Sequence, residues 1–154
     1  MDRVSVLAGS SLFDMLSDEE LKAIAALANE VQAAKGQVLF EEGQLGDALY
    51  VLSQGEVEVL GRDAVGALRT LATLGPQQFF GEMSLIDKEH RSATIRARTD
   101  CELLRLSSDH LTTFRRQHRD GFTFIVINIA RMLSARLREA NQRLATSPLT
   151  NARE

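Results

Sequence analysis

The chain has 154 residues, of which 44% are hydrophobic and 25% are charged, and its formal net charge is -3. This length suits one domain with a sizeable core rather than two, and the balance excludes a disordered chain. The small negative charge gives the molecule as a whole no attraction for nucleic acid or acidic membranes.

A single cysteine, Cys101, excludes an internal disulfide and is consistent with a reducing cytoplasm. Its position at the start of an apolar run predicts a buried, unreactive thiol. The richest apolar stretch, residues 121–130, is shorter than the roughly 20 residues that span a bilayer. We therefore expect a cytoplasmic protein.

The first predicted element is a helix that follows an N-terminal tail over residues 1–11. Ser17 is a good N-cap, and Glu20 stands three residues later, so the two residues predict a capping box. We expect this helix to run to about Glu30. Its buried face should consist of apolar residues at helical spacing: Leu21, Ile24, Leu27 and Ala28.

The middle of the chain follows a two-residue alternation, which is typical of strands. Many short strands without helices between them predict an antiparallel sandwich or barrel, most simply a β jelly roll. The fold class is therefore mainly β with flanking α: an antiparallel β jelly roll with an N-terminal helix and a long C-terminal helix. Glycine-containing turns separate most of the six predicted strands, VLFEEG (38–43), ALYVLSQ (48–54), EVEVL (56–60), LRTLATL (68–74), SATIRAR (92–98) and CELLRLS (101–107).

The helical period returns near the C-terminus. It predicts a short helix over 108–116, a hinge at 119–121 and a long helix from Gly121 to about Leu144. The first half of the long helix is apolar on almost all sides, so it needs burial on two sides. We expect a homodimer through this helix; the alternative is that the sandwich covers all of it. One apolar stripe follows spacings of three and four: Val126, Ile129, Leu133, Leu137, Ala140 and Leu144.

Residues 79–94, FFGEMSLIDKEHRSAT, place a glutamate and an arginine between two predicted strands. Gly81 allows a turn, and residues 82–86 are expected to form one turn of helix, whose free N–H groups attract an anion. Arg91 can bind a phosphate through two parallel hydrogen bonds, and Ser92 adds neutral donors. The carboxylate of Glu82 only accepts, which suits a ribose hydroxyl. The stretch therefore predicts a ribose beside a phosphate; the alternative is an ion pair that braces a loop.

This stretch resembles the phosphate-binding cassette of the cyclic nucleotide-binding domain family. That cassette reads, in outline, Phe-Gly-Glu, two small or apolar residues and Leu, then a variable turn, Arg, one of Ser, Thr or Ala, and Ala. Here FGEMSL at 80–85 and RSAT at 91–94 fill it in order, and the first strands, at 35–59, are also similar. The resemblance covers about residues 12–145, which implies one domain over that range and a C-terminal tail over 146–154.

The resemblance also implies roles for residues of this chain. It implies that Gly81 and Glu82 bind the ribose, with Glu82 accepting from the 2'-hydroxyl. It implies that the phosphate is bound by Met83, Arg91, Ser92 and Ala93. The apolar side of the sugar and base would be lined by Val59, Leu71 and Phe80. Some bacterial members that bind cAMP carry a threonine–serine pair on the long helix, and the nearest match here is Arg136 and Leu137. Residues implied as a base lid are Ser134 and Arg136.

We expect a stand-alone sensor of a cyclic mononucleotide that rearranges its C-terminal helices and so changes the surface offered to a regulated protein partner. The base stays open between cAMP and cGMP, because a hydroxyl at Ser92 can reach a syn guanine and is also found in members that bind cAMP. The chain has no HExxH or GxSxG pattern, so neither catalysis nor a metal or cofactor is expected.

The last ten residues, ATSPLTNARE, cannot supply a recognition helix, so we expect no DNA binding. Two alternatives remain: a module of the same fold that binds no nucleotide, and a fragment of a Crp-like transcription regulator.

Overall fold

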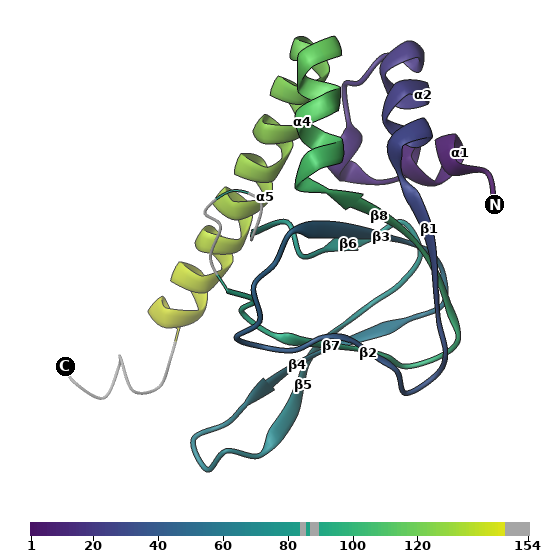
Figure 1. Cartoon of the computed structure of the whole chain (residues 1–154). Coiled ribbons are helices and arrows are strands. Elements are labelled where there is room, and N and C mark those ends of the chain that lie inside the picture. The colour runs from purple at the N-terminus through teal and green to yellow at the C-terminus, as the bar shows by residue number, and fades with distance from the viewer. Residues whose placement is uncertain (84–85, 87–89, 147–154) are drawn as a thin grey trace.

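The structure, a computed structural model, describes residues 1–83, 86 and 90–146. A β sandwich carries helices at one end, and one long helix leads away from it (Figure 1). The predicted mainly β class, with an N-terminal helix and a long C-terminal helix, is confirmed. In chain order the elements are α1 (Arg3–Ala8), η1 (Ser11–Phe13), α2 (Asp18–Leu27), β1 (Asn29–Ala33), β2 (Val38–Phe40), β3 (Ala48–Gln54), β4 (Val57–Arg62), β5 (Leu68–Leu74), β6 (Phe79–Phe80), β7 (Thr94–Ala97), β8 (Cys101–Ser107), α4 (Ser108–Gln117) and α5 (Arg119–Ala145).

The strands form two antiparallel four-stranded sheets, in the orders β1-β8-β3-β6 and β2-β7-β4-β5. All six predicted strands are present, and three of them, β3, β5 and β8, have the predicted bounds. Two short strands, β1 and β6, were not predicted. β1 takes part of the range expected for the first helix, which ends at Leu27 because the next residues pair along β8, with Asn29 opposite Arg105.

The N-terminal residues are more structured than expected. A tail was expected over residues 1–11, but Arg3–Ala8 forms α1, whose Leu7 is fully buried in the core. Asp2 caps this helix, and the Arg3 guanidinium donates to the carbonyls of Ala25 and Ala28 at the end of α2. Burial of a leucine and these bonds stabilise a helix too short to fold alone.

The predicted capping box is confirmed. The Ser17 amide donates to the Glu20 carboxylate at 2.8 Å, and the Glu20 amide donates to the Ser17 hydroxyl at 3.2 Å. The predicted buried face holds for Leu21, Ile24 and Ala28, while Leu27 is half-buried. Together with α1, η1 and the start of α5, this face packs into one core cluster above the sandwich.

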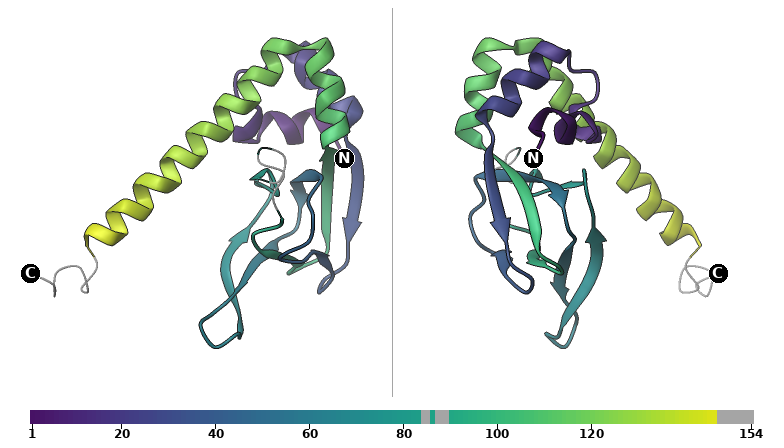
Figure 2. Two further views of the ribbon diagram at one scale, coloured as in Figure 1. Left: turned by 60° about the vertical axis from the view of Figure 1, so that its left-hand side comes forward. Right: turned by 90° about the vertical axis from the view of Figure 1, so that its right-hand side faces the viewer.

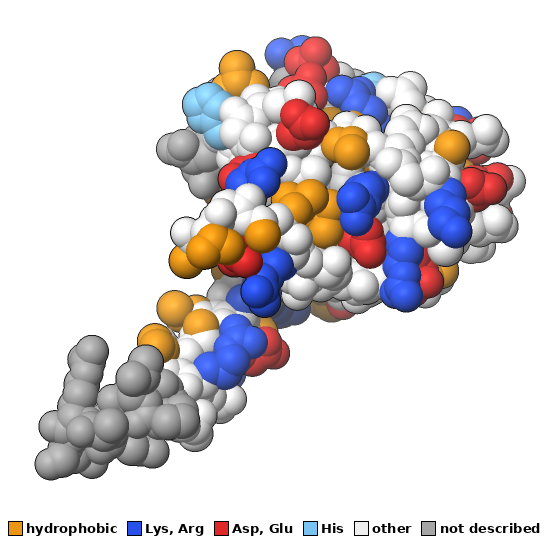
Figure 3. All heavy atoms as spheres, turned by 90° about the horizontal axis from the view of Figure 1, so that it is seen from below, with side chains coloured by type: hydrophobic (Ala, Val, Ile, Leu, Met, Phe, Trp, Pro, Cys, Tyr) orange, Lys and Arg blue, Asp and Glu red, His pale blue; other side chains and the backbone are white. Residues whose placement is uncertain are grey.

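The helix α5 leaves the body of the domain after its first half (Figure 2). Its main packing partners are α4 and η1. The helix begins directly after His118, so the residues 119–121 that were predicted as a hinge form its first turn. Of the predicted apolar stripe, Ile129 is buried, but Val126 is 47% and Leu137 63% exposed. The sandwich of a single chain therefore does not cover the whole helix. Seen from below, exposed hydrophobic side chains mix with basic ones along its projecting end (Figure 3).

Cys101 is buried, as predicted, and burial raises the pKa of its thiol, which keeps it protonated and unreactive. Within the described ranges, no helix combines the length and the apolar character that a membrane crossing needs.

Candidate functional site

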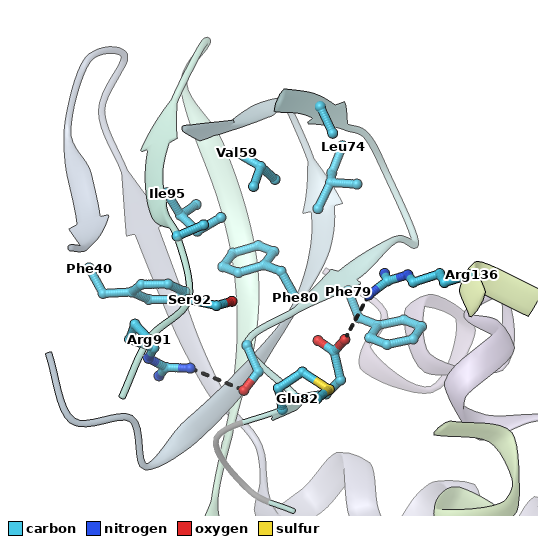
Figure 4. Close-up of a pocket in the computed structure, with 14 residues that line it drawn as sticks. Phe40, Val59, Leu74, Phe79, Phe80, Glu82, Arg91, Ser92, Ile95 and Arg136 are labelled. Atoms are coloured by element: carbon cyan, nitrogen blue, oxygen red, sulfur yellow. Dashed lines mark hydrogen bonds and ion pairs between the residues drawn. The ribbon is translucent and has the colours of Figure 1, made fainter. Parts of the chain in front are cut away.

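A pocket with a cavity volume of about 310 Å³ opens between the two sheets beside α5 (Figure 4). Its volume lies at the small end of the roughly 300–1,000 Å³ that small-molecule sites occupy. Most of its wall is apolar, and two buried charged side chains enter it from the segment between β6 and β7. The lining residues are Phe40, Val59, Ala72, Leu74, Phe79, Phe80, Gly81, Glu82, Met83, Arg91, Ser92, Ala93, Ile95 and Arg136.

Arg91 is a buried cation, only 5% exposed. Its Nη1 donates to the Gly81 carbonyl at 3.0 Å, its Nη2 donates to the Ala48 carbonyl at 2.9 Å, and its guanidinium lies 4.0 Å from the centre of the Phe40 ring. Burial lowers the pKa of Arg91, but an arginine stays charged at neutral pH.

The charge of Arg91 is not neutralised by the described part of the chain. No carboxylate among the described residues lies within ion-pair distance of it. Its buried Nε also has no hydrogen-bond acceptor there. A buried cation with an unused donor costs free energy unless an anion meets it, so this end of the pocket suits an anionic group.

Gly81 brings the backbone close to this cation. Its φ of 86° lies in the left-handed region, which favours glycine. A Cβ at this position would lie 2.7 Å from Nη1 of Arg91 and 3.0 Å from the Ala48 oxygen. Only glycine therefore lets the carbonyl of residue 81 hold the arginine in this orientation.

Glu82 is a buried carboxylate, 4% exposed. Burial raises its pKa, and this effect is opposed by a backbone hydrogen bond and by the charges of Arg136 and Arg91. Its Oε1 lies 3.5 Å from Nη1 of Arg136, which reaches over from α5 (Figure 4). Glu82 and Arg91 are not paired with each other, so the alternative of an ion pair between them is not found. Glu82 retains acceptor capacity for a hydroxyl in the pocket.

Aromatic rings form the floor of the pocket. The ring of Phe80 stacks on that of Tyr50, with centroids 5.3 Å apart, and lies 5.9 Å from that of Phe40. Phe80 and Val59 line the pocket where they were expected. Because the Arg91 guanidinium packs on the Phe40 ring, these rings also help to hold the cation in place.

The expectation for Leu71 is wrong. Leu71 is 65% exposed and lies outside the pocket, which Ala72 and Leu74 line instead. Val59 pairs with Ala72 and Leu60 with Thr70, so a bulge leaves Leu71 without a partner on β4. A one-residue shift moves a side chain to the other face of the sheet. The sequence alternation alone does not reveal this bulge.

The two candidate lid residues on α5 have different positions. Arg136 lines the pocket, whereas Ser134 is exposed and does not. Two residues correspond to about 200° around a helix, so both cannot face the same side. The cassette residues Ser84 and Leu85, which belong to the predicted helical turn at 82–86, lie outside the described residues.

Several lining residues were not predicted: Phe40, Ala72, Leu74, Phe79 and Ile95. Phe79 carried one available signal, because it is a large apolar residue two positions before Gly81 of the cassette. Among the described residues, no three His, Cys, Asp or Glu side chains are grouped so as to hold a metal ion.

Comparison with known proteins gives matches to a domain family and to individual proteins. Residues 30–118 match the family model of the cyclic nucleotide-binding domain. The chain is 38% identical over 146 residues to the cyclic AMP receptor protein of Thermus thermophilus, covering 94% of this chain and 65% of that protein. It is 30% identical over 143 residues to the CRP-like cAMP-activated global transcriptional regulator of Mycobacterium tuberculosis, covering 91% and 61%.

Among solved structures, the crystal structure of the Thermus thermophilus catabolite activator protein matches with a TM-score of 0.79 and 37% identity, covering 88% of this chain and 62% of that one. This chain therefore spans less than two thirds of the length of these relatives.

Proposed function

The chain belongs to the cyclic nucleotide-binding domain family, and from this premise we propose that it is a sensor whose pocket binds a cyclic mononucleotide. The observation that carries the proposal is Arg91, a buried cation with an unused Nε donor and no carboxylate partner among the described residues. A cyclic phosphate supplies the missing charge and acceptor.

We propose that different walls of the pocket bind different parts of the ligand. The phosphate is placed at Arg91, with the neighbouring wall residues Gly81, Met83, Ser92 and Ala93. The ribose is placed at Glu82, whose carboxylate accepts from the 2'-hydroxyl. The base then extends along Val59, Ala72 and Leu74 toward Arg136. We take cAMP as the first candidate, because both curated relatives carry it in their names.

Signalling would pass through α5. Arg136 is the residue of this helix that pairs with Glu82, and a ribose hydroxyl at Glu82 would change that contact. Ligand binding would then shift the position of a helix with few contacts to the sandwich, and with it the surface offered to a protein partner.

Self-association through α5 is part of the proposal. The exposed Val126 and Leu137 lie on the stripe that a second copy would cover. Light scattering tests this: the protein should be a dimer, and Leu137→Glu should shift it toward a monomer. Ala135→Glu, on another side of the same helix, should leave the dimer intact. A monomeric wild type with and without nucleotide would contradict self-association.

A second candidate is the same binding function within a Crp-like transcription regulator. It is supported by the two curated relatives, of whose length the chain spans 61% to 65%. The reading frame that follows codon 154 decides between the two candidates.

Calorimetric titration of cAMP and cGMP tests the binding function. We expect wild type to bind at least one of them and Arg91→Ala to lose more than about 30-fold in affinity, since truncating one member of a buried charged pair costs roughly 2–5 kcal/mol. Arg98→Ala removes an exposed arginine near the end of β7 and should bind like wild type. Circular dichroism checks that each variant is folded. No heat with either nucleotide from folded wild type would refute the proposal.

A further inference from the structure

A buried asparagine stands in the apolar interface between α5 and the N-terminal segment. Asn128 is only 8% exposed, and its Nδ2 donates to the carbonyls of Leu12 at 2.9 Å and Asp14 at 2.8 Å. Both partners are acceptors, so the amide nitrogen must face them. Residues near Asn128 and its partners in the chain belong to one apolar core cluster: Leu12, Phe13, Leu16, Ile125 and Ile129.

These two bonds connect α5 to the end of η1, more than a hundred residues earlier in the chain. Met15, the residue after Asp14, has a φ of 78°, which is unusual for a non-glycine residue, so the chain reverses sharply there. If α5 slid or rotated by one residue, the amide would lose both carbonyls inside an apolar cluster. Such a loss is costly, and a buried polar group of this kind fixes one register of a helix.

C-terminal to Ile129, α5 has no buried residue in the part of the chain that the structure describes. A hollow of about 380 Å³ lies between η1, the turn from β5 to β6, and α5, and both Met132 and Arg136 border it. Arg136 follows Asn128 by eight residues, or about 12 Å along a helix. The Nη1 atom of Arg136 lies 3.5 Å from Oε1 of Glu82. The helix thus crosses an open space between its buried polar anchor and the pocket.

We propose that Asn128 is a positioning residue: its bonds to Leu12 and Asp14 fix the register of α5 on η1 and thereby hold Arg136 at Glu82. A helix is stiff over two turns, so an error in register at Asn128 is transmitted to Arg136. The N-terminal segment, which has no lining residue in the nucleotide pocket, therefore contributes to its geometry.

The register of α5 on η1 can be tested without nucleotide. Spin labels at the exposed Gln54 of β3 and Ala135 of α5, in a Cys101→Ala background diluted with unlabelled protein, report the distance between helix and sandwich within one chain. We expect one narrow distance distribution for wild type and a broadened or shifted one for Asn128→Leu, which keeps the volume and removes both donors. Thr123→Val is the control, because it removes a hydrogen bond that lies within α5. An unchanged distribution for Asn128→Leu would overturn the inference. If that variant does not fold, Asn128→Ser takes its place.

The effect on the pocket is tested by a double-mutant cycle, and only this part rests on the proposed nucleotide binding. Asn128→Leu should weaken cAMP binding by no more than Arg136→Ala does, and the double variant should bind as Arg136→Ala alone. Losses that multiply would show that Asn128 does not act through Arg136 and would overturn the positioning role. If wild type binds no nucleotide, the proposed function fails, while the distance measurement still decides whether Asn128 sets the register.

Discussion

The two ends of the pocket are built in different ways. At the closed end, Gly81, Arg91 and Phe80 lie inside the sandwich, and hydrogen bonds, a left-handed glycine and stacked rings fix them. At the open end, the edge strand β5 is exposed along most of its length, and the side chain of Arg136 is 58% exposed.

This difference separates affinity from response. A group that is held in place before the ligand arrives costs little to order, so the closed end should supply most of the binding free energy. The open end is formed by an edge strand and a helix with few contacts to the sandwich, so a ligand can move it at small cost. Substitutions should therefore have large effects at the closed end and small ones at the open end.

Gly81→Ala should have the largest effect. Alanine is strained at a φ of 86°, and its Cβ would meet the Arg91 guanidinium at 2.7 Å. We expect the free energy of unfolding to fall by about 1–3 kcal/mol and cAMP affinity to fall more than about 30-fold. Chemical denaturation and calorimetry measure the two quantities.

Gly66→Ala is the matched control for this experiment. Gly66 has a φ of 80°, but a Cβ there would have no atom within 4 Å. It therefore shares the backbone strain without the collision. If both variants bind cAMP equally well, the close approach at Arg91 is not what shapes the closed end.

The next largest effect is a pH dependence of the free energy of unfolding that arises from Glu82. Burial raises the pKa of this carboxyl, so the folded protein binds its proton more tightly than the unfolded chain does. The free energy of unfolding should consequently fall as pH rises from the ordinary carboxyl value of 4.5 through the raised pKa of the folded state. Glu82→Gln removes this contribution, so it should be more stable than wild type at neutral pH and should lose that advantage below 4.5.

The same variant should weaken nucleotide binding, because an amide replaces the carboxylate that we propose accepts from the ribose. Urea denaturation at several pH values and calorimetry at neutral pH separate the two effects. Glu139→Gln, on the exposed side of α5, serves as the control. A wild type and a Glu82→Gln variant with parallel stability curves would contradict the buried charge as the cause.

Arg136→Ala should have a smaller effect. Its side chain is half-exposed and its contact with Glu82 is 3.5 Å long, and ion pairs of this kind are worth roughly 0.2–1 kcal/mol. We expect cAMP affinity to fall by at most about fivefold. Arg138→Ala, an exposed arginine two residues later, should bind like wild type. If Arg136→Ala loses as much affinity as Arg91→Ala, the two ends do not differ as described.

Much of the closed end could be predicted from the sequence, because its signals are local. Gly81, Glu82 and Arg91 lie within one short motif, and the capping box of Ser17 and Glu20 lies within four residues. The features that were missed depend on distant partners. Strand β1 forms because Asn29 pairs with Arg105, and Asn128 finds its carbonyls 114 and 116 residues away. No local pattern contains such information.

The open end was predicted less well for a second reason. The position of β5 was correct to the residue, but a single bulge between its pairs with Val59 and Leu60 placed Ala72 in the pocket and Leu71 outside it. A strand has a period of two, so an error of one residue is enough to exchange the two faces.

Leu71→Ser should have the smallest effect, and it tests this register directly. The side chain is 65% exposed, so its loss should change the free energy of unfolding by no more than about 0.5 kcal/mol and cAMP affinity by less than about twofold. Ala72→Leu, one residue later, adds volume inside the pocket and should weaken binding more strongly, although it enlarges the apolar surface of the strand. Calorimetry on the two variants compares the faces of one strand. A weaker affinity for Leu71→Ser than for Ala72→Leu would mean that the bulge is absent from the protein in solution, and the wall of the open end would then consist of the residues that the simple alternation predicts.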